Sequence, residues 1–282
     1  MKKILVPVDF SKTSIIALDT AFDIAKKAGS EILLLHVVEE PGNDSFSASG
    51  QINVEDWEDR LFTYRIIEKS KKQLEKLVLD AKYKDVKLEG IVRVGNAFHG
   101  MTTIIAEQKV DLVIMGTKGS NSLSEMIIGT NTERVVRHAK VPVLTVQKKP
   151  AKGDFKNIVY ATSMAGDEEV FSRIVKRAQQ IYGSTIHLVR INTPSDFQKD
   201  QAVREYMEKF AKKLQLKNFT INIYNDFSTE EGIVRFADYV NADMIAMATH
   251  GRTGFAHVLA GSIAEGVVKM ASRPVLTWVV KK

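Results

Sequence analysis

The chain has 282 residues, more than the roughly 100–200 residues of an ordinary domain, so we expect two domains. Its composition, 44% hydrophobic and 26% charged, is that of a globular protein and excludes disordered and fibrous classes. No apolar run approaches the ~18–20 residues that a membrane helix needs, so no membrane partner is expected. Because the chain has no cysteine, disulfides and Cys-ligated metals are excluded, and we expect a cytoplasmic location.

The charge balance is 40 basic against 34 acidic residues, a net charge of +6. The densest basic runs, residues 69–72 and 209–213, fall in segments with helical periodicity and are typical of solvated helix faces. The basic residues are otherwise scattered, so a nucleic-acid partner is not indicated.

A shift of 132 residues aligns residues 110–145 with residues 242–277. The identities include Asp111/Asp243, Met115/Met247, Thr117/Thr249, Gly119/Gly251, Gly129/Gly261, Glu133/Glu265 and Pro142/Pro274. Chance does not place glycines and prolines in register in this way, so the chain is a tandem duplication. We expect domains at residues 1–148 and 154–282, joined by a short charged linker.

Strands and helices alternate in the first copy. The expected strands are residues 3–9, 31–38, 86–94, 111–115 and 141–147, and the expected helices are residues 11–28, 55–81, 97–108 and 131–139, with a loop at residues 39–54.

The second copy repeats this order. Its expected strands are residues 157–161, 184–191, 219–225, 243–248 and 274–280, and its expected helices are residues 167–182, 197–216, 228–240 and 262–271. Such alternation predicts right-handed crossovers, and hence an α/β fold with a five-stranded parallel sheet and helices on both faces in each domain.

In such sheets, ligands bind beyond the carboxyl ends of the strands, where the strand order reverses. Asp9 follows the first strand of copy one, Gly116 and Gly119 follow the fourth, and Gly129 and Thr130 open the next helix. Glycines allow close backbone approach, and a helix N-terminus favours phosphate. The pattern predicts a purine nucleotide site. The alternative is that the glycines only form a turn and Asp9 only caps a helix.

Several stretches strongly resemble the universal stress protein family: ILVPVDFS (4–11), LLHV (34–37), MGTKG (115–119), IIGTNTERVVRHA (127–139) and VPVLTV (141–146). Copy one also fulfils the G-x2-G-x9-G-(S/T) signature of the ATP-binding branch of this family. The resemblance covers essentially the whole chain. It implies two tandem Rossmann-like domains of the adenine nucleotide alpha hydrolase type, ATP with Mg²⁺ as cofactor, and a role in stress response or signalling.

The resemblance also implies roles for single residues. Asp9 and the Val37 backbone are expected to hold adenine, with Pro7 and Val8 lining the base and Met115 and Gly116 near the ribose. The phosphates are expected to be surrounded by Lys118, Gly119, Gly129, Thr130, Asn131 and Thr132. The apolar final strands, residues 141–146 and 274–280, are expected to pair between the domains or between chains as a homodimer.

Copy two departs from the pattern, with Ala248 at the first glycine position and Ser163 and Ala161 at the positions of Asp9 and Pro7. We therefore expect copy one to be the main nucleotide site. A phosphate-sized anion is the most that copy two is expected to bind, at His250, Gly251, Arg252, Gly261 and Ser262.

The sequence assigns no catalytic residue and no metal-ligand set. It contains neither a P-loop motif nor a G-x-G-x-x-G motif after a strand, and no base is placed to activate water. At most slow ATP hydrolysis is expected. Two alternatives stay open: an enzyme that transfers a nucleotidyl or phosphoryl group, and a nucleotide-free dimerisation module.

Overall fold

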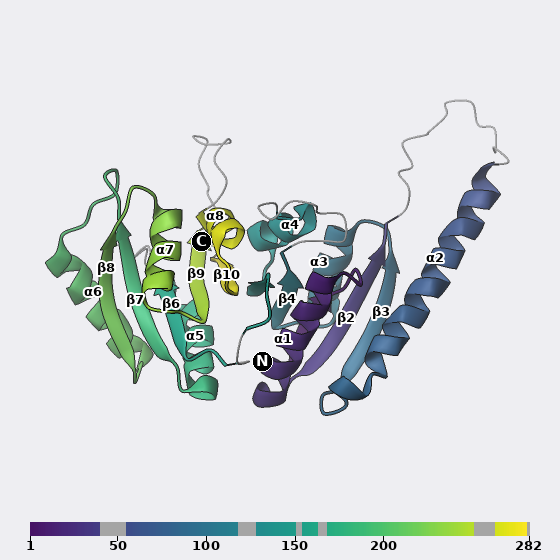
Figure 1. The fold of residues 1–282 in the computed structure, drawn as a ribbon, viewed down its shortest axis with the longest axis horizontal. Coiled ribbons are helices and arrows are strands. Elements are labelled where there is room, and N and C mark those ends of the chain that lie inside the picture. The colour runs from purple at the N-terminus through teal and green to yellow at the C-terminus, as the bar shows by residue number, and fades with distance from the viewer. Residues whose placement is uncertain (40–54, 118–127, 151–153, 163–167, 251–262, 281–282) are drawn as a thin grey trace.

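A computed structural model describes residues 1–39, 55–117, 128–150, 154–162, 168–250 and 263–280. Within these residues, ten strands form one continuous sheet flanked by helices (Figure 1). In the first half the strands are β1 (Lys3–Pro7), β2 (Glu31–Val38), β3 (Leu88–Val94), β4 (Leu112–Gly116) and β5 (Val143–Val146). In the second half they are β6 (Asn157–Ala161), β7 (Thr185–Asn192), β8 (Phe219–Asn225), β9 (Met244–His250) and β10 (Val275–Val280).

The strand order is β3-β2-β1-β4-β5-β10-β9-β6-β7-β8, and the pairs within each half are parallel. The order reverses between β1 and β4, and again between β6 and β9. Each half is therefore a doubly wound Rossmann-like unit, which confirms the predicted fold class.

The helices are α1 (Lys12–Ala28), α2 (Glu55–Val78), α3 (Ala97–Glu107), α4 (Thr130–His138), α5 (Glu169–Tyr182), α6 (Asp200–Leu214), α7 (Thr229–Tyr239) and α8 (Ile263–Met270). Among the described residues, none of them is both long and apolar enough to cross a membrane. Successive residues of β1 alternate between two buried clusters: Ile4 and Val6 belong to one and Leu5 to the other. Burial on both faces explains why the central strands read as continuous apolar runs.

Two helix boundaries differ from those expected by three residues. The helix expected to continue to residue 81 ends at Val78, because Asp80 caps a short 3₁₀ turn by accepting from the Lys82 amide at 2.9 Å. The helix expected from residue 197 begins at Asp200. The side-chain amide of Asn192 donates to the Gln198 carbonyl and accepts from the Gln198 amide, and these two bonds hold the loop before the helix. Both differences arise from side-chain to backbone hydrogen bonds that compete with the helix.

The two halves meet at an antiparallel pair of strands. Thr145, Leu144 and Val143 of β5 pair with Val275, Leu276 and Thr277 of β10. The Thr145 hydroxyl donates to the Val275 carbonyl at 3.2 Å, and the Thr277 hydroxyl donates to the Val143 carbonyl at 3.4 Å. Because the 132-residue shift exchanges these two bonds, a pseudo-two-fold axis passes through the Leu144–Leu276 pair. Both strands have a sheet neighbour on each side, so the open edges of the sheet are β3 and β8.

Beside this seam, one ion pair joins α4 to α8. The Arg137 guanidinium donates to both carboxyl oxygens of Glu265, at 2.7 Å each. These bonds raise the pKa of Arg137 above its ordinary value. Gln147 donates to the Val268 carbonyl at 3.4 Å. The contact between the halves is therefore polar as well as apolar.

A repeated carboxylate clamp joins the start of the first strand in each half to the start of its fourth strand. Asp111 accepts from the amides of Lys2 and Lys3, at 2.5 and 3.1 Å. In the second half, Asp243 accepts from the amides of Lys156 and Asn157, at 2.8 Å each. Burial raises the pKa of Asp111, but the two amide bonds together with nearby positive charges such as Lys2 outweigh burial, and the pKa lies below its ordinary value.

Asp111→Asn is expected to lower the free energy of unfolding by about 0.5–1 kcal/mol at pH 7, because the clamp loses its charge-assisted bonds. Since the pKa of Asp111 is lower in the folded state, its contribution is complete above the unfolded pKa, about 3.9, and is lost as the pH falls through the folded value. Urea unfolding at pH 7, 5 and 3 measures this. Asp200→Asn, on the exposed face of α6, is the control, and a stability difference that does not change with pH contradicts the prediction.

Candidate functional site

The predicted nucleotide residues of copy one lie where the strand order reverses. The register of β1 with β4, Leu5 opposite Val113, brings the carboxyl ends of these strands to the same edge of the sheet. Pro7 and Val8 end the first strand, Met115 and Gly116 end the fourth, and β2 lies on the other side of β1. Val37 of β2 and the start of α4 lie at this edge as well. Lys118 and Gly119 lie outside the described residues.

Asp9 has a local role at this edge. One of its carboxyl oxygens accepts from the Ser11 amide at 3.0 Å. Ser11 in turn caps α1 by accepting from the Ser14 amide at 3.2 Å. The alternative expected from the sequence, that Asp9 supports the start of the next helix, is therefore present. This bond also fixes the carboxyl group at the carboxyl end of β1.

Two residues to which the sequence assigned no role, Phe10 and His36, lie beside Asp9. The Phe10 backbone has φ = 60°, a left-handed conformation that is strained for an aromatic residue and is typical of functional sites. The Phe10 and His36 rings lie 4.6 Å apart, and His36 Nδ1 is 2.7 Å from the Val8 carbonyl. Because a carbonyl only accepts, Nδ1 carries the proton. The pair therefore lies beside the end of β1, and Phe10 also packs against the buried cluster that contains Ile4 and Val6.

Gly116 is needed for packing between β4 and α1. A Cβ atom at this position would lie 3.0 Å from the Thr13 carbonyl carbon, carbonyl oxygen and Cβ. Contacts this short are rare for real Cβ atoms, so a side chain at this position would force the backbone of α1 to shift away from the end of β4. The first glycine of the signature therefore has a structural reason that the ligand-based interpretation did not include.

The N-terminus of α4 follows directly on this edge. Gly129 is the N-cap residue and brings no side chain to the cap, while its own amide donates to the Thr117 carbonyl at 2.9 Å. The first intrahelical bond runs from the Glu133 amide to the Gly129 carbonyl. The amides of Thr130, Asn131 and Thr132 therefore have no acceptor within the helix. Amides in this position, together with the helix dipole, favour an anion.

The side chains of this first turn divide into two kinds. The Thr132 hydroxyl donates to the Gly116 carbonyl at 3.0 Å and is buried, so it joins α4 to β4. Thr130 is exposed and Asn131 is half-buried. Of the three α4 side chains expected around the phosphates, Thr130 and Asn131 are therefore the accessible ones.

The corresponding edge of the second half carries a buried carboxyl group. Glu168, 2% exposed, accepts from the Tyr160 hydroxyl at 2.8 Å and from the Thr162 hydroxyl at 3.1 Å. Thr162 directly follows β6, so the carboxyl oxygens lie at the carboxyl end of that strand. Burial, and then the neighbouring Glu168, raise the pKa of Tyr160, which keeps its hydroxyl a donor.

Most of the anion site expected in copy two is not described. Ser163, Gly251, Arg252, Gly261 and Ser262 lie outside the described residues, and only the backbone of His250, at the end of β9, is described. Ala161 and Ala248 lie on β6 and β9, the two strands between which the order reverses. The sequence pattern did not predict the position of Glu168, because the residue reaches this edge as the N-cap of α5.

Both halves match the same family model, described as the universal stress protein family, over residues 1–147 and 154–278. The chain belongs to the universal stress protein family. Universal stress protein MJ0577 of Methanocaldococcus jannaschii is 33% identical over 156 residues, which cover 52% of this chain and 96% of that protein. Universal stress protein Slr1230 of Synechocystis is 24% identical and spans 99% of this chain and all of its own length.

Among solved structures, a universal stress protein from Archaeoglobus fulgidus superposes with a TM-score of 0.75 at 18% identity. The match covers 98% of this chain and 97% of the other. This likeness extends over both halves and supports the tandem fold of this universal stress protein.

Proposed function

We propose that this universal stress protein binds ATP through its N-terminal half and acts as a nucleotide-responsive stress or signalling protein in the cytoplasm. The observation that carries the proposal is the N-terminus of α4, whose first amides lack acceptors within the helix and lie at the edge where β1 and β4 end. Family resemblance supplies the choice of adenine.

In this proposal the base lies against the carboxyl end of β1, between Asp9 and the Val37 backbone. The Phe10 and His36 rings lie beside Asp9 with their planes inclined at 37°, so one ring face is the most that this pair is proposed to offer the base. The phosphates lie over the first turn of α4, close to Thr130 and Asn131. Asp9 is the one carboxylate among the proposed ligands, so Mg²⁺ would be held chiefly by phosphate oxygens and water.

The second half is proposed to bind nucleotide weakly or not at all. Ala248 and Ser163 stand at the positions of Gly116 and Asp9, so the second half lacks the carboxylate proposed for the base and carries a methyl group where the first half has a bare backbone. In this proposal, each chain therefore binds one nucleotide.

Thr130→Glu is expected to lower ATP affinity at least tenfold, because the added carboxylate lies where the phosphates bind (tenfold is about 1.4 kcal/mol). A glutamate in the first turn of a helix is stabilising, so the unfolding midpoint should not fall. Titration calorimetry and thermal unfolding of the full chain measure both quantities. Thr229→Glu, at the first position of α7, is the matched control and should leave ATP affinity unchanged.

Denaturing freshly purified protein and identifying the released nucleotide by chromatography and mass gives the stoichiometry. About one ATP or ADP per chain, lost in Asp9→Ala, agrees with the proposal. If a double substitution of Gly251 and Gly261 abolishes binding while Asp9→Ala does not, the second half is the site. If no nucleotide is released and added ATP does not bind, the nucleotide-free interaction module is the better interpretation.

A further inference from the structure

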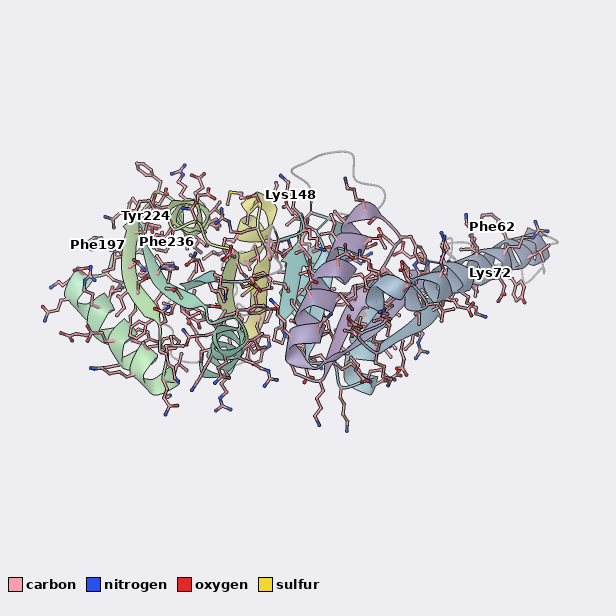
Figure 2. All side chains as sticks on the ribbon, turned by 60° about the horizontal axis from the view of Figure 1, so that its bottom comes forward. Phe62, Lys72, Lys148, Phe197, Tyr224 and Phe236 are labelled. Carbon is pink, nitrogen blue, oxygen red and sulfur yellow. The ribbon has the colours of Figure 1, made fainter. Side chains whose placement is uncertain are left out.

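The N-terminal half of α2 is an apolar helix surface without a partner among the described residues. The C-terminal half packs on the sheet, where Ser70 and Leu74 are buried. The preceding turns project beyond the edge of the sheet (Figure 1). There Leu61, Phe62 and Tyr64 are 43%, 58% and 61% exposed, and Figure 2 shows Phe62 on this projecting part. Three large apolar side chains within one turn are more than scattered exposure explains.

Charge along α2 is polarised about these three residues. The first turns are acidic in sequence, with Glu55, Asp56, Glu58 and Asp59. The turns after the apolar residues are basic overall, with Arg65, Lys69, Lys71 and Lys72 exposed and Lys71 paired with Glu68 at 3.0 Å. In Figure 2 Lys72 lies further along the same helix than Phe62. One helix therefore carries an acidic end, an apolar centre and a basic segment.

This pattern is complementary to itself when a second helix runs in the opposite direction. Antiparallel pairing places the acidic end of each helix against the basic segment of the other, and the apolar residues meet in the centre. Parallel pairing instead places like charges together, which is unfavourable. A two-fold contact of this kind uses the same surface on both chains.

We propose that a second copy of this chain docks on the N-terminal half of α2, so that two α2 helices pack antiparallel through Leu61, Phe62 and Tyr64. Two observations favour a second copy over another partner. The charge pattern on α2 complements that same pattern, and β5 and β10, the final strands of the halves, are already paired within the chain. An anionic membrane is disfavoured by the acidic first turns. The proposal does not depend on nucleotide binding.

Sedimentation velocity of the full chain, over about 1–200 µM because a contact of this size is expected to be weak, tests the proposal. The wild-type chain should dimerise within this range. Phe62→Ser combined with Tyr64→Ser should raise the dissociation constant at least tenfold. Leu79→Ser, a 74% exposed residue just beyond the end of α2, is the matched control and should change the constant less than twofold.

A charge exchange tests the antiparallel arrangement. Lys69→Glu with Lys72→Glu should weaken the dimer at least tenfold, and adding Glu55→Lys and Glu58→Lys, the acidic positions on the same helix face as Phe62, to the same chain should restore it. Circular dichroism checks that each variant stays folded. A chain that is monomeric throughout the range overturns the proposal, whether or not it binds anionic vesicles. A dimer unaffected by the Phe62 and Tyr64 substitutions, or one that the charge exchange does not restore, overturns it as well.

Discussion

Gly116→Val is expected to lower the free energy of unfolding by about 2–3 kcal/mol, the upper part of the usual range for overpacking. Its Cβ would lie 3.0 Å from backbone and Cβ atoms of Thr13, and these atoms cannot move without shifting α1. Truncating the Thr13 side chain to alanine gives no relief, because none of the three contacting atoms is removed. Equilibrium urea unfolding of the full chain measures the loss.

Gly100→Ala is the matched control for Gly116→Val. A Cβ at Gly100 meets only the Val37 side chain, at 3.1 Å. In the interior of a helix such as α3, alanine is more stable than glycine by about 1 kcal/mol. We expect the control to remain within about 1 kcal/mol of the wild-type stability. If Gly116→Val proves equally well tolerated, the packing role assigned to Gly116 is wrong.

Arg137→Met is expected to lower the free energy of unfolding by about 1–3 kcal/mol. The substitution leaves the Glu265 carboxyl, which is 10% exposed, without its two guanidinium bonds, while methionine keeps the aliphatic stem. The estimate lies below that for a fully buried pair, because the Arg137 side chain is 47% exposed and water screens part of the interaction.

The same arginine provides its own control, since it also contacts Glu133 on the exposed side of α4 at 3.2 Å. Glu133→Gln should cost less than about 0.5 kcal/mol, as exposed i,i+4 pairs do. Arg137→Met combined with Glu265→Leu should recover much of the loss, because the buried carboxyl group is then removed together with its arginine. Differential scanning calorimetry follows all three variants. Equal losses for Glu133→Gln and Arg137→Met would mean that the contact between the halves contributes little.

The architecture was predictable because the repeat and the periodicity are local properties of the sequence. Residues 4–7 read as apolar on both faces, and the glycines recur at a fixed shift, so a parallel, doubly wound sheet in each half and the sheet edge that carries the candidate site follow. The end of α2 at Val78 was not predictable, since Asp80 competes for the backbone through a hydrogen bond that periodicity does not register.

The site was predictable only as far as it depends on chain position. Residues that follow strands β1 and β4 are brought to one edge by the topology alone. The left-handed backbone of Phe10, the bond from His36 to the Val8 carbonyl and the burial of Glu168 are set by tertiary contacts. A sequence pattern with a period of two or 3.6 residues carries no information on such contacts.

The pseudo-two-fold seam has a consequence for how this chain can diverge. In a dimer of identical subunits every substitution appears twice, and the pairing fails on dilution. Here the two halves share one covalent chain, so the effective concentration of one for the other does not change with the amount of protein. A substitution alters one half only, as at Arg137, whose counterpart under the 132-residue shift is Lys269. One half can therefore lose its ligand and still stabilise the other half through the β5–β10 pair.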